Sequence, residues 1–268
     1  MATSPDIDHC LTLIRRESAR TVALLDSLDT ARWQQTSNCP PWTVRDLAAH
    51  VISGGTTFRV AVEQGVAGSV VQAISEHQRD QLMAEITANG PAGAARALEQ
   101  ATDAFEKTYQ SLTSAQLDAI CFHRRGNRPA RWYVRHRLAE MAFHHLDLDR
   151  STGGQADFPR DVAEALLPTL FESNMPRTHH LGPRGTGRVR VVDSNNPAAS
   201  WVLDATPESL TVKTGDSDAQ AQILAPAEDL AMISYGRLTV AQAEASGRAR
   251  LSGDRDLALR WHQIFATP

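Results

Sequence analysis

The first half of the chain shows the three- and four-residue apolar spacing that is typical of amphipathic helices. Apolar side chains recur at helical steps between Asp6 and Leu28. A second helix is expected to begin at Thr43, because Asp46 three residues later completes a capping-box pattern. Further helices are expected over residues 70–88, 92–110 and 130–149. The pattern predicts a bundle in which each helix buries one apolar stripe.

The second half of the chain has a different pattern, with short β-branched runs bounded by turn residues. Because strands mixed with helices follow a run of helices, two domains of different class are expected. The boundary is expected between Ser151 and Gly182, and we place it so that the domains are 1–155 and 156–268. The expected strands are 188–193, 200–205, 210–214 and 249–251, and the expected helices are 227–235 and 257–265.

Composition narrows the partners and the environment of the chain. With a net charge of −4, the chain gives no reason to expect nucleic acid or an anionic membrane as its main partner. No apolar run approaches the roughly 20 residues of a membrane span, and no signal peptide is recognised. Cys10, Cys39 and Cys121 are odd in number and form no CxxC pair, so reduced thiols are expected. These features predict a soluble, cytoplasmic protein. We expect it to be a monomer or dimer with small-molecule partners.

One expected helix carries two residues whose spacing suits a metal site. Glu140 and His144 lie four residues apart, which places both side chains on one face of the helix. His50 is flanked by apolar residues and is the best candidate for a third ligand from a facing helix. Two histidines and one carboxylate leave a coordination position open, as in catalytic zinc sites. The same ligand set also binds iron(II).

Other interpretations of these residues stay open. A glutamate and a histidine four residues apart are common on solvated helix faces, and His136, Glu140 and His144 form one polar stripe. His145 lies about 140° around the helix axis from Glu140 and is expected to point elsewhere. Cys39 is expected to be a packing residue rather than a nucleophile.

A basic run leads into the helix that carries this pair of residues. Its arginines could form a mouth for an acidic substrate, because arginine binds carboxylates bidentately. A solvated loop and helix face is the simpler interpretation. Arg59 and Arg79 could also face the site. The arginines of the run are Arg124, Arg125, Arg128, Arg131, Arg135 and Arg137.

Two segments resemble motifs of the mycothiol-dependent maleylpyruvate isomerase family. They are PPWTVRDLAAHV, which ends at Val51, and LAEMAFHHLDLD, which ends at Asp149. The resemblance implies that the metal ligands are His50, Glu140 and His144, with Asp147 as a supporting or helix-capping residue.

A third segment, residues 219–265, looks like the sterol-carrier-like domain that is often fused to such bundles. In that domain a glycine-arginine pair matches Gly236 and Arg237 here. The resemblance therefore implies that Arg237 is a catalytic-site residue that holds an anionic group.

The resemblance implies a fold of class α + α/β, with an N-terminal DinB-like up-down four-helix bundle and a smaller C-terminal α/β domain. It also implies a divalent metal, for which we expect Zn²⁺, and mycothiol as the low-molecular-weight thiol cosubstrate. The activated thiol could isomerise a small acidic substrate, or it could be transferred or exchanged to make an S-conjugate. The alternatives are an enzyme that acts on another thiol conjugate in specialised metabolism and a non-catalytic small-molecule binding protein.

Overall fold

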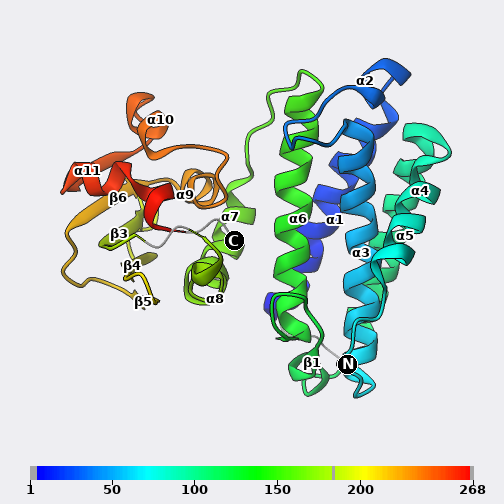
Figure 1. Cartoon of the computed structure of the whole chain (residues 1–268), viewed down its shortest axis with the longest axis horizontal. Helices are drawn as coiled ribbons and strands as arrows, with labels where there is room; N and C mark the ends of the chain where they lie inside the picture. The colour runs from blue at the N-terminus through cyan, green and yellow to red at the C-terminus, as the bar shows by residue number, and fades with distance from the viewer. Residues whose placement is uncertain (1–4, 183–184, 266–268) are drawn as a thin grey trace. The chain divides into compact units, whose positions relative to one another are not determined.

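The chain folds into two compact units in the computed structural model, which describes residues 5–182 and 185–265. The units are Met1–Asp157 and Phe158–Pro268, and each is described by itself. Figure 1 shows helices throughout the first unit and a sheet with shorter helices in the second. None of the described helices is both long enough and apolar enough to cross a bilayer.

Four long helices build the first unit (Figure 1). Both α1 and α3 pack against α5 and α6, so the predicted four-helix bundle is confirmed. The long helices are α1 (Pro5–Asp26), α3 (Val44–Val66), α5 (Gly90–Ser111) and α6 (Ala130–Ser151). The shorter elements are α2 (Thr30–Gln34), α4 (Glu76–Thr87), the 3-10 helix η1 (Gln116–Asp118), β1 (Ile120–Cys121) and β2 (Arg128–Pro129).

The N-terminus of α3 is fixed by the capping box that the sequence predicts. The hydroxyl of Thr43 accepts a hydrogen bond from the backbone N–H of Asp46 at 3.2 Å, and the Asp46 carboxylate accepts one from the backbone N–H of Thr43 at 3.1 Å. Two N–H groups that the helix itself leaves unpaired are thereby satisfied. Helix α3 begins at Val44, so His50, six residues later, lies on its second turn.

One helix boundary differs clearly from the expectation. The helix predicted over residues 70–88 is wrong in its first part, because α4 begins only at Glu76. Ser75 and Gln78 form a second capping box there, and residues 70 and 71 ahead of it are exposed. Helix α3 continues through the glycine pair at 54 and 55, where the side chain of Arg137 on α6 lies next to Gly55.

A five-stranded sheet forms the core of the second unit, in the order β5-β4-β3-β6-β7. The central strands β3 and β6 are parallel, with Val191 opposite Ile223, and the other pairs are antiparallel. Helix α9 packs on β3, and α11 packs on β3 and β6. The strands are β3 (Gly187–Asp193), β4 (Ser200–Ala205), β5 (Leu210–Thr214), β6 (Ala221–Ala225) and β7 (Arg250–Gly253).

The helices of the second unit are short. The single helix predicted over residues 257–265 is instead α11 and α12, separated at Arg260, while β6 was not predicted. The elements are α7 (Arg160–Thr169), the π-helical turn η2 (Leu170–Asn174), α8 (Met175–Thr178), the 3-10 helix η3 (His179–Leu181), α9 (Ala227–Ser234), α10 (Val240–Ala245), α11 (Arg255–Leu259) and α12 (Trp261–Ile264). The mixed α/β class expected for this part of the chain is confirmed.

Candidate metal centre

The structure brings His50 of α3 together with Glu140 and His144 of α6. Oε2 of Glu140 lies 3.3 Å from Nε2 of His50 and 3.5 Å from Nε2 of His144. The three donor atoms all lie within 4.8 Å of one another. Two ligands at about 2.1 Å from a tetrahedral zinc ion are about 3.4 Å apart, so the three side chains fit a divalent metal without rearrangement of either helix.

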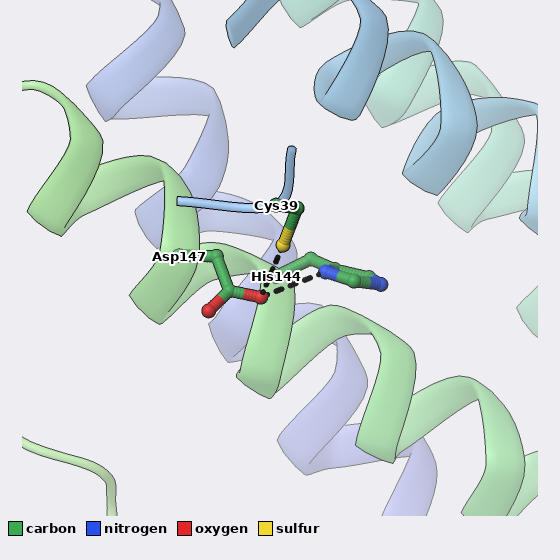
Figure 2. Close-up of side chains that lie close together, drawn as sticks. All are labelled: Cys39, His144 and Asp147. Atoms are coloured by element: carbon green, nitrogen blue, oxygen red, sulfur yellow. Dashed lines mark hydrogen bonds and ion pairs between the residues drawn. The ribbon is translucent and has the colours of Figure 1, made fainter. Parts of the chain in front are cut away.

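The His144 ring is oriented by a carboxylate on the same helix. Nδ1 of His144 lies 3.0 Å from Oδ2 of Asp147, and the thiol of Cys39 donates to that oxygen at 3.2 Å. Figure 2 shows the three side chains, with Cys39 reaching α6 from the loop before α3. A carboxylate that accepts a hydrogen bond from one imidazole nitrogen leaves the other nitrogen free to bind a metal. Asp147 therefore turns Nε2 of His144 toward the centre.

The His50 ring has polar and aromatic neighbours of its own. Nη2 of Arg79, on α4, lies 2.8 Å from Nδ1 of His50. The Trp42 ring lies 4.7 Å from the His50 ring, centroid to centroid. Arg79 thus contacts the ring nitrogen that does not face Glu140, and Trp42 packs against the ring itself.

Burial and hydrogen bonding together set the charges at the centre. Burial alone would raise the pKa of Glu140, but hydrogen bonds from His144 and His50 hold it well below its usual value. Burial alone would lower the pKa of His144, but hydrogen bonds to Asp147, Cys39 and Glu140 hold it well above its usual value. Burial lowers the pKa of His50. At neutral pH the centre without a metal therefore holds an anionic Glu140, a protonated His144 and a neutral His50.

The alternative of a solvated stripe on α6 is wrong. The side chains of His136, Glu140 and His144 are only 23%, 24% and 14% exposed. His136 stacks on Trp132 with ring centroids 4.4 Å apart, and burial lowers its pKa to about 4. Its Nε2 lies 3.9 Å from Oε1 of Glu140, the oxygen that does not face the other two histidines. His136 is therefore a neutral neighbour of the centre.

His145 points away from the centre, as the helical spacing predicts. Its Nδ1 lies 3.1 Å from the hydroxyl of Thr21 on α1, inside the bundle. Burial lowers the pKa of His145 to about 4, so the ring is neutral. It serves the packing of α6 against α1.

A cavity of about 210 Å³ adjoins the centre. His50 and Glu140 form part of its wall, beside aromatic side chains and two arginines, Arg79 and Arg124. The aromatic residues that line it are Phe58, Phe122, His123, Tyr133 and His136. The cavity therefore combines a metal-binding wall, flat apolar surfaces and positive charge.

Most of the basic run supports the fold rather than the cavity. Arg131 pairs with Asp118 at 2.7 Å, and Arg135 pairs with Asp6. Arg128 is buried over the Trp132 ring and donates to backbone carbonyls. Arg137 is fully buried and donates to the carbonyl of Val51 at 2.6 Å. The structure describes all six arginines of the run, and among them only Arg124 lines the cavity.

Arg237 and Cys39 are two further residues that the sequence singles out. Arg237 lies in the second unit, in the turn after α9, and its Nη1 donates to the carbonyl of Tyr235 at 2.8 Å. Cys39, expected only to pack, contacts the carboxylate that orients His144. Nothing in its sequence context signals that contact, because the partner lies 108 residues away.

The comparisons with known proteins agree with this arrangement of two units. The model of the mycothiol maleylpyruvate isomerase N-terminal domain matches residues 14–149. The model of the SCP-2 sterol transfer family matches residues 183–266. No match was found among the curated proteins.

Solved structures share the fold over nearly the whole chain. The crystal structure of a mycothiol-dependent maleylpyruvate isomerase is similar with a TM-score of 0.64 and 19% identity, over 94% of this chain and 96% of that one. A histidine-to-alanine mutant of a mycothiol-dependent maleylpyruvate isomerase gives a TM-score of 0.64 and 18% identity over the same shares. Because the N-terminal model covers half of the sequence, the chain belongs to the mycothiol maleylpyruvate isomerase N-terminal domain family.

Proposed function

We propose that the chain is a mycothiol-dependent metalloenzyme that isomerises, or attaches a thiol to, a small acidic substrate. The observation that carries the proposal is the convergence of His50, Glu140 and His144 at tetrahedral ligand spacing, beside a cavity. A divalent metal held there, for which we propose zinc, supplies an open coordination position that lowers the pKa of a thiol. Mycothiol is proposed from family membership and from the solved isomerases with the same fold.

The chain's own residues would divide the remaining work. Asp147 holds His144 in the ligating orientation, and Cys39 donates to the same oxygen of Asp147. At about 210 Å³ the cavity is smaller than the sites of drug-sized ligands, which favours a small substrate. Phe58 and Tyr133 offer flat walls for a planar, unsaturated group.

Positive charge favours an acidic substrate. Arg79 and Arg124 line the cavity, and a guanidinium binds a carboxylate through two parallel hydrogen bonds. We also propose that Arg237, in the 156–268 domain, holds an anionic group of the substrate or the thiol. The three proposed metal ligands, His50, Glu140 and His144, all lie in the proposed 1–155 domain.

The reaction is tested with the zinc-loaded protein, mycothiol and maleylpyruvate. An isomerised product has the mass of the substrate, whereas an S-conjugate has the added mass of the thiol, so mass spectrometry separates the two outcomes. Conversion should require mycothiol and should be lost in His50→Ala. The proposal would be contradicted if turnover without mycothiol, or turnover by His50→Ala, equalled that of the complete wild-type reaction.

A second candidate function is the binding of an apolar ligand by the C-terminal domain, which the sterol-transfer match favours. The described part of the second unit contains an open cavity of about 390 Å³, but its lining is polar and includes Arg190, Asp216 and Gln222. A polar lining suits an apolar ligand poorly. The metalloenzyme therefore remains the better-supported function.

A further inference from the structure

Arg79 occupies an unusual position for a charged side chain. It lies on α4, half-buried, in the wall of the cavity that also contains His50 and Glu140. Its Nη2 donates a hydrogen bond to Nδ1 of His50 at 2.8 Å. A guanidinium has five N–H donors and no acceptor, so Arg79 uses a small part of its bonding capacity on the imidazole.

The guanidinium of Arg79 has no carboxylate within 4.0 Å among residues 5–182 and 185–265. Arg59 on the neighbouring helix α3 makes a useful contrast, because it is held by both carboxylate oxygens of Glu63, at 2.7 and 2.8 Å. Arg59 is not among the residues that line the cavity. Of these two arginines, Arg79 is the one with capacity left for an anion that enters the cavity.

The contact between Arg79 and His50 conflicts with metal binding by His50. Arginine only donates, so Nδ1 of His50 is the acceptor and the ring proton sits on Nε2, facing Glu140. A metal on Nε2 needs the lone pair of that nitrogen, which moves the ring proton to Nδ1. Nδ1 then becomes a donor that faces another donor. Arg79 cannot keep its bond to His50 once the metal is bound.

We propose that Arg79 is an anion-binding residue of this cavity and that metal loading releases it from His50. The inference rests on the proposed function, because it takes His50 as a metal ligand. In the protein without metal, the hydrogen bond to His50 fixes the guanidinium beside the imidazole. In the metal-loaded protein, the guanidinium is free to bind a carboxylate of the substrate or the thiol bidentately. Occupation of the metal centre and binding of the anion are thereby coupled.

The first test is zinc affinity, measured by competition with a chromophoric chelator for wild-type protein, Arg79→Met and Arg59→Ala. Loss of one hydrogen bond to a charged group changes an equilibrium constant by about tenfold. Arg79→Met should therefore bind zinc about tenfold more tightly than wild type, because the bond that competes with the metal is gone. Arg59→Ala, which changes an arginine outside the cavity, should bind zinc as the wild type does.

The second test is calorimetric titration with fumarate, a rigid dicarboxylate whose two carboxylates cannot chelate one ion. Zinc-loaded wild type and zinc-loaded Arg59→Ala should bind fumarate alike. Zinc-loaded Arg79→Met should bind it at least about tenfold more weakly, because a bidentate charged pair is lost. In the metal-free wild type the affinity should also fall, since His50 then holds the guanidinium.

The outcomes separate this inference from the proposed function. If the wild type binds no zinc, both are overturned. If it binds zinc, but Arg79→Met shows wild-type zinc affinity and wild-type fumarate affinity, the inference alone is overturned. Tighter zinc binding together with weaker fumarate binding in Arg79→Met supports it, since a merely structural arginine would not move the two affinities in opposite directions.

Discussion

Oδ2 of Asp147 lies 3.0 Å from Nδ1 of His144, one turn along α6, and fixes the ring so that Nε2 faces Glu140. The side chain of Asp147 is 6% exposed, so water competes little for this contact. The same oxygen accepts from the Cys39 thiol, which ties the loop before α3 to the ligand helix. The orientation of the His144 ring is therefore set by a residue of the same helix and reinforced by a thiol from the loop before α3.

Removing the carboxylate of Asp147 should weaken metal binding. Loss of a partner that orients a histidine ligand typically costs about 10- to 100-fold in metal affinity, and we expect Asp147→Ala to fall in this range. Asp147→Asn keeps an oxygen that can accept from Nδ1 and should recover most of the affinity. Chelator competition measures both, with Asp103→Ala, at an exposed position of α5, as the control. Wild-type affinity in Asp147→Ala would show that His144 needs no support.

Zinc binding should release a proton. Hydrogen bonds to Asp147, Cys39 and Glu140 outweigh the effect of burial and hold the pKa of His144 well above its usual value, so metal-free protein carries this proton at pH 7. Binding must expel it, so the apparent affinity should rise by about tenfold per pH unit up to the raised pKa. The lowered pKa of His50 means that this ring contributes no further proton. Calorimetry in buffers of different ionisation enthalpy counts the protons, and a buffer-independent heat would contradict the prediction.

Two glycines on α3 should respond oppositely to alanine. A Cβ at Gly65 would lie 2.5 Å from Sγ of Cys121 and 2.8 Å from the carbonyl oxygen of Ile120, so β1 would have to move. We expect Gly65→Ala to lower the free energy of unfolding by about 1–3 kcal/mol. A Cβ at Gly54 meets its nearest neighbour, Nη1 of Arg137, at 3.9 Å. Gly54→Ala should therefore raise the free energy of unfolding by about 0.5–1 kcal/mol, through helix propensity.

Urea denaturation of both variants provides the comparison. The unfolding midpoint should shift down in Gly65→Ala and up in Gly54→Ala. A midpoint in Gly65→Ala equal to that of the wild type would mean that β1 packs against α3 more loosely than these distances indicate.

Local signals in the sequence were enough to place the ligand helices. The capping box at Thr43 sets where α3 begins, and the four-residue step from Glu140 to His144 puts two donors on one face of α6. His50 could be proposed because a polar ring among apolar neighbours on a helix must find a partner inside the bundle. These features depend on residues close together in the chain, where periodicity and capping are informative.

The surroundings of the ligands depend on tertiary packing and could not be predicted. The sequence left both Arg59 and Arg79 as residues that could face the site, and it is the packing of α4 beside α3 that brings Arg79 to His50. The arginine run looked like a single basic surface, yet Arg128 and Arg137 are buried against backbone carbonyls. Which arginine pairs, which is buried and which faces the cavity is decided by the neighbouring elements.

The metal content of three purified proteins tests the central claim most directly: wild type, His50→Ala and His136→Ala. After saturation with zinc and extensive dialysis, elemental analysis should find about one zinc per chain in the wild type. His50→Ala should retain almost none, because only Glu140 and His144 remain as ligands. His136→Ala, which changes the imidazole on the other side of Glu140, should retain the wild-type amount. Equal zinc in His50→Ala and the wild type would contradict the account.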